Sequence, residues 1–264
     1  MADISAKDVQ TLRKATGAGM MDAKRALVET GGDFDAAATW LREQGLAKAA
    51  SRSERDNSEG TVAAAVVDGS AAIVELKSET DFVAKSKRFV GLADELATLV
   101  ATEGEDAVGS RAGEIDDLRI TLKENIELGR VIRFESGDDA VLDAYVHRQA
   151  GRGVNAVLVE LDGGSSELAH DIALHIASAR PEYRSIDEVP AAAVDAERTT
   201  LENISRNEGK PEAALPKIVE GRLRGWYAER VLLEQKFVKD EKQTIRDVLA
   251  GANIRRFAQV EIGR

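Results

Sequence analysis

The sequence predicts an α+β fold in which one sheet-and-helix unit occurs twice. Each copy begins with two short apolar strands and continues into a helix with apolar residues at every third or fourth position. The two copies comprise 61–67, 72–76 and a helix ending near Val100, then 141–146, 156–161 and a helix ending near Ala179.

The two copies differ in length at one place. Between the matched residues Leu76 and Leu92 the first copy has 15 residues, whereas between Leu161 and Leu168 the second has 6. The surplus contains 80–85, which reads Thr-Asp-Phe-Val-Ala-Lys. Both copies need the same core, so a segment that only one copy carries is the better candidate for function.

A third strand is expected to complete each sheet. Apolar residues at 126–134 indicate this strand for the first copy, and those at 254–262 indicate it for the second. A short helix at 244–249 precedes the last strand. The stretch 101–118 is acidic and contains glycine, so it is expected to be a surface loop with a little helix.

The N-terminal residues 1–50 are expected to form three short helices. Met21, Ala26 and Leu27 are expected to face inward on the second of them. The charges of this segment balance, which favours a docking module over a catalyst. The polar stretch 51–60 has no periodicity and is predicted to be a linker.

Near the C-terminal end, helices at 191–207 and 217–234 are joined by a Gly-Lys-Pro turn. This pattern predicts an antiparallel helical hairpin, and its many charges indicate that it projects from the body. The predicted domains are a docking bundle at 1–52, a first core subdomain at 57–139, a second at 140–186 completed by 244–264, the inserted hairpin at 187–234, and a C-terminal segment at 235–264.

Composition excludes several functions. The 264 residues carry a net charge of −11, which argues against nucleic acid as a direct partner because phosphate binding needs a basic surface. No cysteine is present, so disulfides and thiolate chemistry are excluded. No apolar run reaches membrane-spanning length and no signal peptide is evident, so a cytoplasmic protein that does not bind membranes is expected.

The three histidines, His147, His170 and His175, do not form a metal site by spacing. The latter two are five residues apart, which misses the i, i+4 spacing of two ligands on one helical face. Nucleotide-binding loops and nucleophile motifs are also absent from the sequence. An enzyme is therefore not expected, and neither a cofactor nor a metal is.

The surplus segment follows a strand and opens a helix. Thr80 or Asp81 can cap that helix, which places Phe82 in its first turn. An aromatic ring at such a corner is either packed into the core or offered to a partner. Position alone leaves both alternatives open, while the absence of this segment from the second copy favours exposure and binding.

Longer motifs point to a known family. The segments 12–27 and 80–85 resemble the two signatures of bacterial elongation factor Ts, and 175–181, 209–211 and 219–222 are similar to its later landmarks. The resemblance implies a ubiquitin-associated-like bundle, a duplicated core and a protruding helical hairpin. It also implies guanine-nucleotide exchange on elongation factor Tu, in its GDP-bound and nucleotide-free forms, and leaves dimerisation possible.

The resemblance also implies the partner-binding residues. A wedge that displaces Mg²⁺ from the GTPase corresponds to Thr80, Asp81, Phe82 and Val83, with Phe82 inserting and Asp81 hydrogen-bonding beside it. Further contacts are implied for Lys24 in the bundle, Leu122, His147 on the loop of the second copy's hairpin, Val238 and Lys239. The chain departs from the family at Leu122-Lys123, where related sequences carry an apolar residue followed by glycine.

Two other functions remain open from the sequence. The chain could be a non-catalytic binding or chaperone-like module that uses the same surfaces for another protein. It could also be an unrecognised hydrolase. Measuring GDP release from elongation factor Tu separates nucleotide exchange from both.

Overall fold

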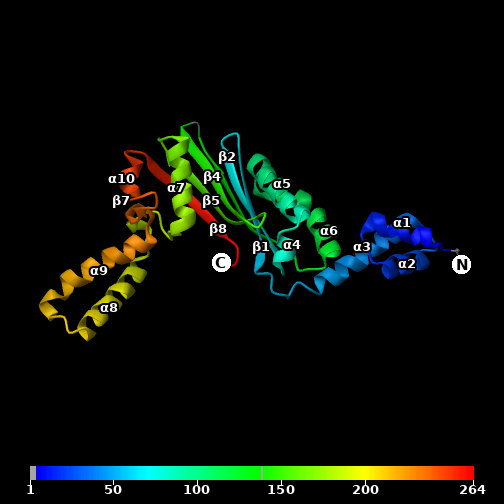
Figure 1. The fold of residues 1–264 in the computed structure, drawn as a ribbon, viewed down its shortest axis with the longest axis horizontal. Coiled ribbons are helices and arrows are strands. Elements are labelled where there is room, and N and C mark those ends of the chain that lie inside the picture. The colour runs from blue at the N-terminus through cyan, green and yellow to red at the C-terminus, as the bar shows by residue number, and fades with distance from the viewer. Residues whose placement is uncertain (1–3, 138) are drawn as a thin grey trace.

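The computed structural model describes residues 4–137 and 139–264 and shows a mixed α+β molecule with helices and antiparallel sheets. Residues 1–3 of the predicted first domain and residue 138 of the predicted second lie outside that description. The molecule is elongated (Figure 1). Its N-terminal helices lie at one end, the sheets lie in the middle, and a pair of long helices lies at the other end.

The N-terminal bundle forms because each of its helices has a clear start and an apolar face. Its helices are α1 (Ala6–Thr16), α2 (Met20–Glu29) and α3 (Phe34–Ala50). Ser5 and Asp8 form a capping box at α1, and Asp33 caps α3 by accepting a hydrogen bond from the Ala36 backbone. The buried residues of the bundle are Val9, Leu12, Ala23, Ala26, Leu27, Ala37 and Leu41.

One inward residue of α2 was predicted wrongly. Met21 is 74% exposed, whereas Ala23 is fully buried. Ala23, Ala26 and Leu27 follow the i, i+3, i+4 spacing of one helical face, and Met21 lies on the opposite side of that helix. The prediction rested on the hydrophobicity of Met21, but the helical spacing places Ala23 on the buried face instead.

Among the described residues, the longer strands form two three-stranded antiparallel sheets with the same topology. In each sheet the second strand of the copy is central, and the third strand, predicted from the sequence at 126–134 and 254–262, completes it. The first sheet contains β1 (Glu59–Val67), β2 (Ser70–Ser78) and β3 (Glu127–Glu135); the second contains β4 (Ala140–Gln149), β5 (Arg152–Asp162) and β8 (Asn253–Glu261).

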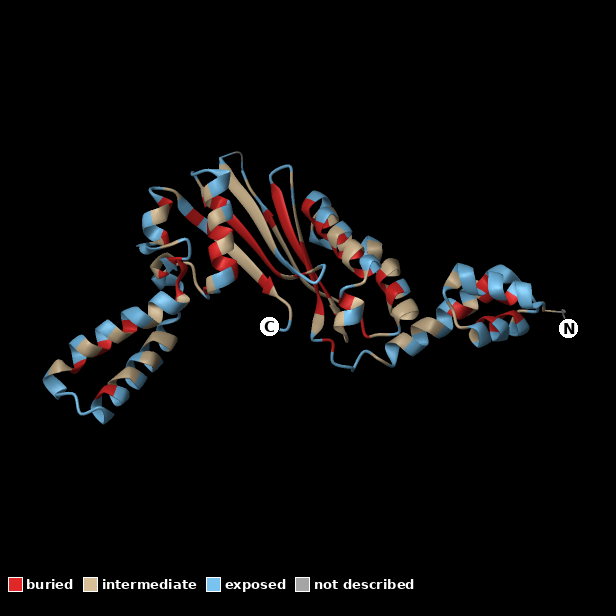
Figure 2. Cartoon of the chain, in the orientation of Figure 1, coloured by how far each residue is buried: buried red, intermediate tan, exposed pale blue. Residues whose placement is uncertain are grey.

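The two sheets pack face to face between two helices, so the core has four layers. Helix α5 (Lys87–Glu103) covers the outer face of the first sheet, and α7 (Ser166–Ala179) covers that of the second. Strand alternation explains this arrangement: Val74 and Leu76 face α5, while Ala71 and Ile73 face the second sheet. The central strands are accordingly buried along most of their length (Figure 2).

Each central strand also buries one carboxylate on the side that faces the other sheet. Glu75 pairs with Arg130 of β3, with 3.0 Å between Oε2 and Nε. Arg130 also donates to the Glu261 carbonyl of the second sheet at 2.8 Å. Burial alone would raise the pKa of Glu75, but the hydrogen bonds and charge of Arg130 lower it below its ordinary value.

The second copy has the same arrangement, with its arginine donating to a carbonyl of the first sheet. Glu160, fully buried, accepts hydrogen bonds from Ser136, Arg255 and Arg256. Arg256 of β8 also donates to the Glu135 carbonyl of the first sheet at 2.9 Å. Burial opposes ionisation of Glu160 as well, yet its hydrogen bonds lower the pKa overall. In each sheet, an arginine of the third strand therefore binds the buried carboxylate of its own sheet and a backbone carbonyl of the other sheet, and so links the two.

The stretch 101–118 is mostly helical, which corrects the prediction of a surface loop. Helix α5 continues to Glu103, a 3-10 helix covers Glu105–Arg111, and α6 follows at Ala112–Leu122. The acidic, glycine-containing composition concealed a short apolar stripe. Ile115 and Leu118 of that stripe are buried in the core of the first copy.

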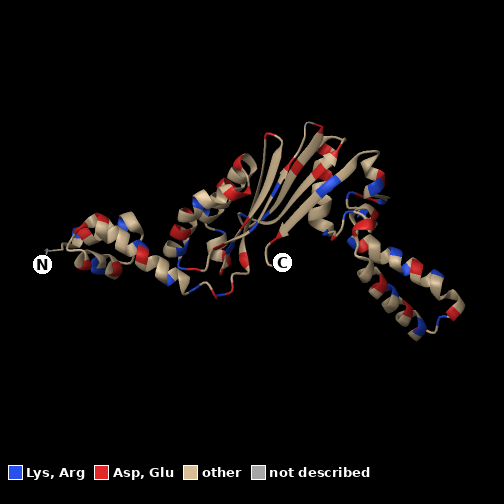
Figure 3. Cartoon of the chain, turned by 180° about the vertical axis from the view of Figure 1, so that it is seen from behind, with Lys and Arg blue, Asp and Glu red and all other residues tan. Residues whose placement is uncertain are grey.

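Two long helices, α8 (Ala191–Asn207) and α9 (Leu215–Arg230), lie against each other and extend away from the sheets (Figure 1). Basic and acidic residues both occur along the two helices (Figure 3). Helix α9 ends at Arg230, not at residue 234 as predicted. Val231 is extended, and Val231 and Leu232 are both fully buried. The packing of these two side chains therefore ends the helix.

The chain then returns to the second sheet through short elements. A 3-10 helix at Leu232–Glu234 is followed by a small ribbon and one short helix. These are β6 (Lys236–Phe237), β7 (Asp240–Thr244) and α10 (Ile245–Leu249), which begins with a capping box formed by Thr244 and Asp247.

We expect Glu160→Gln to lower the free energy of unfolding by about 3 kcal/mol, because it removes a fully buried charge from two arginines. Urea unfolding at pH 7 measures the loss. Glu167→Gln in the first turn of α7 is the control and should change stability by less than about 0.5 kcal/mol. Equal stability of the two variants would contradict the cross-linking role of Glu160.

Replacing 191–229 by a short glycine linker should leave the two-sheet core intact, since α8 and α9 make most of their contacts with each other. Arg230 must be kept because its carbonyl accepts backbone hydrogen bonds from Glu182 and Tyr183. A cooperative thermal transition with the original sheet signal in circular dichroism is the expected result. Loss of cooperativity would show that the two helices support the core.

Candidate functional site

The surplus segment of the first copy forms one helical turn, α4 (Asp81–Ala84), between β2 and α5. Thr80 caps it, and its hydroxyl accepts a hydrogen bond from the Val83 backbone at 3.4 Å. Ala84 is fully buried and anchors the turn in the core, against which Val83 also packs. The turn is therefore fixed on one side and free on the other.

The free side of this turn presents Phe82. Its side chain is 84% exposed, the largest value among the large apolar residues that the structure describes. The sequence left open whether this ring packs inward, and the structure places it in solvent. Burying a phenylalanine stabilises a protein by about 2–3 kcal/mol, so an exposed ring on an anchored turn leaves this free energy available to a partner.

Asp81 next to this ring is already engaged. Its carboxylate forms an i, i+4 ion pair with Lys85. The hydrogen bond from Lys85 is the main reason that the pKa of Asp81 lies below its ordinary value. Asp81 is therefore ionised at neutral pH, and a partner that hydrogen-bonds to it must share it with Lys85 or displace Lys85.

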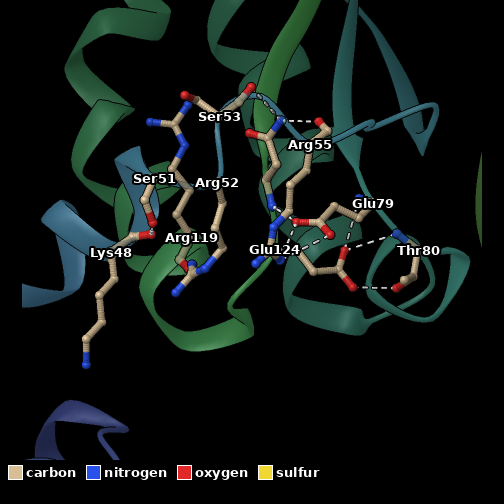
Figure 4. A network of polar contacts seen from close by, with 10 residues as sticks. Lys48, Ser51, Arg52, Ser53, Arg55, Glu79, Thr80, Arg119 and Glu124 are labelled. Carbon is tan, nitrogen blue, oxygen red and sulfur yellow. Dashed lines mark hydrogen bonds and ion pairs between the residues drawn. The ribbon is translucent and has the colours of Figure 1, made fainter.

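Beside this turn, the Glu124 carboxylate holds the backbone that leads into it, and the Glu79 carboxylate holds the backbone that follows Glu124 (Figure 4). Glu124 accepts hydrogen bonds from the backbone of Glu79 and of Thr80, both at 3.1 Å, and from the Thr80 hydroxyl. Glu79 in turn accepts one from the Asn125 backbone at 2.6 Å. The sequence analysis did not single out Glu79 or Glu124. Only the position of Glu79 directly before the surplus segment could have indicated one of them.

The same network holds the predicted linker. The buried Asn125 side chain donates to the carbonyls of Ser53 and Arg55, at 3.2 and 2.8 Å. Arg52 donates to the Arg119 carbonyl at 3.2 Å. Residues 51–55 form turns, and β1 begins at Glu59. The segment between the bundle and the first sheet is thus fastened to the core beside the turn that carries Phe82.

Leu122 and Lys123 lie at the C-terminal end of α6, directly before Glu124. Leu122 is half-buried and packs against the core of the first copy. Lys123 has left-handed backbone angles, with φ 60° and ψ 29°. A side chain costs about 1 kcal/mol there, and glycine avoids that cost. This conformation explains why the resemblance leads one to expect glycine at this position.

His147 lies in strand β4, not on the loop where it was expected, because β4 extends to Gln149. Its side chain is exposed, and Nδ1 lies 3.3 Å from the hydroxyl oxygen of Tyr145. The start of β5, which follows β4 directly, packs against the start of β1, where the Gly153 backbone donates to the Thr61 hydroxyl at 3.1 Å. A Cβ at Gly153 would lie 2.0 Å from the Val62 carbonyl oxygen, so only glycine permits this approach.

The structure brings some of the predicted residues together and separates others. The start of β1 pairs with the end of β2, which leads into α4, so 80–83, Leu122 and His147 share one end of the two-sheet core. Lys24 is exposed on α2, and Val238 and Lys239 form the turn between β6 and β7. These elements lie toward opposite ends of the molecule (Figure 1).

The turn between β6 and β7 is attached to α7 at two points. Lys239 pairs with Asp171 at 2.5 Å, and the Val238 backbone donates to Nδ1 of His175 at 3.3 Å. Because Nδ1 accepts, the ring proton is on Nε2, which donates to Gln235 at 2.9 Å. Burial lowers the pKa of His175, so its ring is neutral at pH 7.

Within 4–137 and 139–264, no group of three or more histidine, aspartate or glutamate side chains is arranged to hold a metal ion. No helix in the same ranges is long and apolar enough to cross a membrane.

Comparison with known proteins decides the family. Residues 79–264 match the family model described as elongation factor TS. Over the whole of both chains, the sequence is 44% identical to elongation factor Ts of Clavibacter michiganensis subsp. michiganensis, and 43% identical to those of Mycobacterium avium and Thermobifida fusca. The chain belongs to the elongation factor Ts family.

This result confirms the resemblance seen in the sequence, and elongation factor Ts proteins are elongation factors of protein biosynthesis with a guanine-nucleotide exchange role. The family match begins at Glu79, so it includes α4 and the exposed Phe82. The curated elongation factor Ts relatives also cover the N-terminal bundle.

We expect stability to decrease as the pH falls below about 6.5, the ordinary pKa of histidine. The pKa of His175 is lower in the folded state, so below that pH the unfolded state binds the proton more strongly and is favoured. In His175→Asn, the melting temperature should change less between pH 7 and pH 5.5. His170→Gln, on the exposed face of α7, is the matched control. The same flattening in both variants would contradict the assignment to His175.

Proposed function

We propose that this chain is a guanine-nucleotide exchange factor for elongation factor Tu, which binds its GDP-bound and nucleotide-free forms and acts in the cytoplasm. Membership of the elongation factor Ts family supports the partner and the activity. The observation that carries the mechanism is the exposed Phe82 ring on an anchored turn that only one of two matching copies contains.

Exchange of this kind needs binding energy and no covalent chemistry. A GTPase holds GDP through its phosphate-binding loop and Mg²⁺, so release is slow without help. A factor that binds the empty GTPase more tightly than the loaded one weakens GDP binding by the same ratio, because the two equilibria are linked. We therefore assign the chain no enzymatic reaction and no cofactor.

The wedge in this proposal is 80–83. Phe82 inserts near the Mg²⁺ and phosphate site of the GTPase, and Asp81 hydrogen-bonds beside it after giving up part of its contact with Lys85. Thr80 and Val83 hold the turn from below. An aromatic side chain suits this task because it buries a large area while losing few rotamers.

The remaining contacts dock the factor along its length. In the proposed division, the ubiquitin-associated-like bundle at 1–52 binds through Lys24, the two core subdomains contribute Leu122 and His147, and the C-terminal segment contributes Val238 and Lys239. Four of the five are exposed, and they lie on α2, on β4 and on the turn between β6 and β7. Contacts spread in this way fix the orientation of the wedge better than a single patch could.

A non-catalytic binding or chaperone-like role would use the same surfaces. Exposed apolar side chains can serve such a role, and Met20, Met21 and Val28 of α2 are exposed. The family and the single anchored ring favour exchange. Release of nucleotide is the property that separates the two functions.

We expect catalytic amounts of this chain to accelerate release of labelled GDP from elongation factor Tu without hydrolysing it. Phe82→Ala should lower the maximal rate about tenfold or more, since an anchoring aromatic contributes about 2 kcal/mol at an interface. Stability should change by less than about 1 kcal/mol because the ring is exposed.

Val66→Ala is the control, since it removes another exposed apolar side chain from the core region. Release should be unchanged in that variant. Unaccelerated release by the original chain would refute the exchange function. A Phe82→Ala variant that retains full activity would refute the wedge alone.

A further inference from the structure

The short helix α4 depends on one carboxylate from another part of the chain. Glu124 lies 44 residues from Thr80 in the sequence, yet it accepts hydrogen bonds from the Thr80 backbone and hydroxyl and from the Glu79 backbone. A single helical turn is unstable alone, because nucleation costs more than one hydrogen bond returns. The direction of α4 therefore depends on the contacts at its start as well as on the burial of Ala84 at its end.

Glu124 controls the cap itself. The Thr80 hydroxyl donates to Glu124, so its oxygen is left to accept from the Val83 backbone. The Thr80 hydroxyl has one proton to donate, and the hydrogen bond to the Glu124 carboxylate fixes its direction. Phe82 lies inside the turn that this cap closes, between Thr80 and Val83. The position of the ring thus depends on the charge of Glu124.

A reciprocal bond holds Glu124 in place. The Glu79 backbone donates to Glu124, while the Glu79 carboxylate accepts from the backbone of Asn125, at 2.6 Å. The side chain of Asn125 holds the segment that leaves the N-terminal bundle through Ser53 and Arg55. The turn after α6 therefore connects residues 53–55, which follow the N-terminal bundle, to residues 79–80 at the start of the wedge (Figure 4).

We propose that Glu124 is a positioning residue for Phe82. It sets the orientation of the exposed ring through Thr80, and it does not touch the partner itself. This inference rests on the proposed exchange function. A general structural role would instead make Glu124 a contributor to stability whose loss affects all activities equally.

The test compares Glu124→Gln with Glu127→Gln. Glutamine keeps the size of the side chain but loses the charge. Its one carbonyl oxygen can replace either Oε2, which accepts from the Glu79 and Thr80 backbone, or Oε1, which accepts from the Thr80 hydroxyl, but not both. Glu127 is a matched control, since it is a half-buried carboxylate three residues away that accepts from Asn57 at 2.8 Å. The measurement is GDP release from elongation factor Tu over a range of factor concentrations.

The expected result for Glu124→Gln is a maximal release rate lowered about tenfold, the effect of losing one charge-assisted hydrogen bond. The half-saturating concentration should stay within about twofold, since the docking contacts are untouched. Glu127→Gln should change neither quantity. A raised half-saturating concentration with an unchanged maximal rate would overturn the proposal.

Combining Glu124→Gln with Phe82→Ala separates positioning from general damage. If Glu124 acts through the ring, the double variant should release GDP no more slowly than Phe82→Ala, within about twofold. Additive losses would overturn the proposal. If Glu124→Gln fails to fold, Thr80→Ala replaces it, because it removes the hydroxyl that donates to Glu124. Thr80→Ala should then lower the maximal release rate while the half-saturating concentration stays within about twofold, and an unchanged maximal rate would overturn the proposal.

Different results would refute the positioning role of Glu124 and the exchange function. A Phe82→Ala variant with lowered release beside a fully active Glu124→Gln variant refutes the positioning role and leaves the exchange function standing. Absence of accelerated release by the unaltered chain refutes the exchange function itself.

Discussion

The face-to-face packing of the two sheets is the constraint on which the other features depend. Its apolar layer includes Val62 and Ile73 from the first sheet and Leu158 from the second, and at its margins lie the buried carboxylates Glu75 and Glu160. A carboxylate is costly to bury unless it is paired and hydrogen-bonded. Both conditions are met by arginines of the third strands, which also donate to carbonyls of the opposite sheet. Slippage of one sheet along the other would break these bonds, so the register of the core is well defined.

This fixed register gives the surplus segment a rigid base. The start of β5 reaches the start of β1 only because Gly153 lacks a side chain, and β1 pairs with β2 up to Ser78. The backbone therefore enters Glu79 and Thr80 from a fully paired strand. From there the hydrogen bonds to the Glu124 carboxylate direct it into α4, while the Glu79 carboxylate holds the Asn125 backbone beside Glu124. A flexible loop at the same place could present an aromatic ring, but ordering that ring on binding would cost conformational entropy.

Much of the fold could be predicted from the sequence because it rests on local periodicity. The repeated strands, the third strands of both sheets and the helix at 191–207 follow directly from alternation or helical spacing. The errors occurred where packing overrides local pattern. Met21 is more apolar than Ala23 but lies on the wrong helical face, and 217–234 was predicted as one helix although buried Val231 is extended.

The candidate site also has a part that the sequence predicted and a part that it did not. The exposure of Phe82 could be anticipated, because the sequence showed that one copy carries a segment the other lacks. Glu124 could not, since its role depends on a contact with Thr80 over 44 residues, and a glutamate in a polar turn has no local signature. His147 was identified through the family, but its strand continues past the predicted end. Long-range polar contacts are thus what the sequence hides, even where its motifs are clear.

Some of the residues that we propose to contact the partner lie on elements away from α4 (Figure 1). Lys24 lies on the bundle, and Val238 and Lys239 lie on a turn held by α7, so a partner that contacts both ends spans most of the molecule. Between them, the bundle's exit is fastened by Asn125, and Asn125 is fastened to Glu79 directly before the wedge. The bundle is therefore connected to the base of α4 through hydrogen bonds and not through a free linker. In the proposed exchange function, binding of the partner to the bundle would help to hold the Phe82 ring in place, because the two are connected in this way.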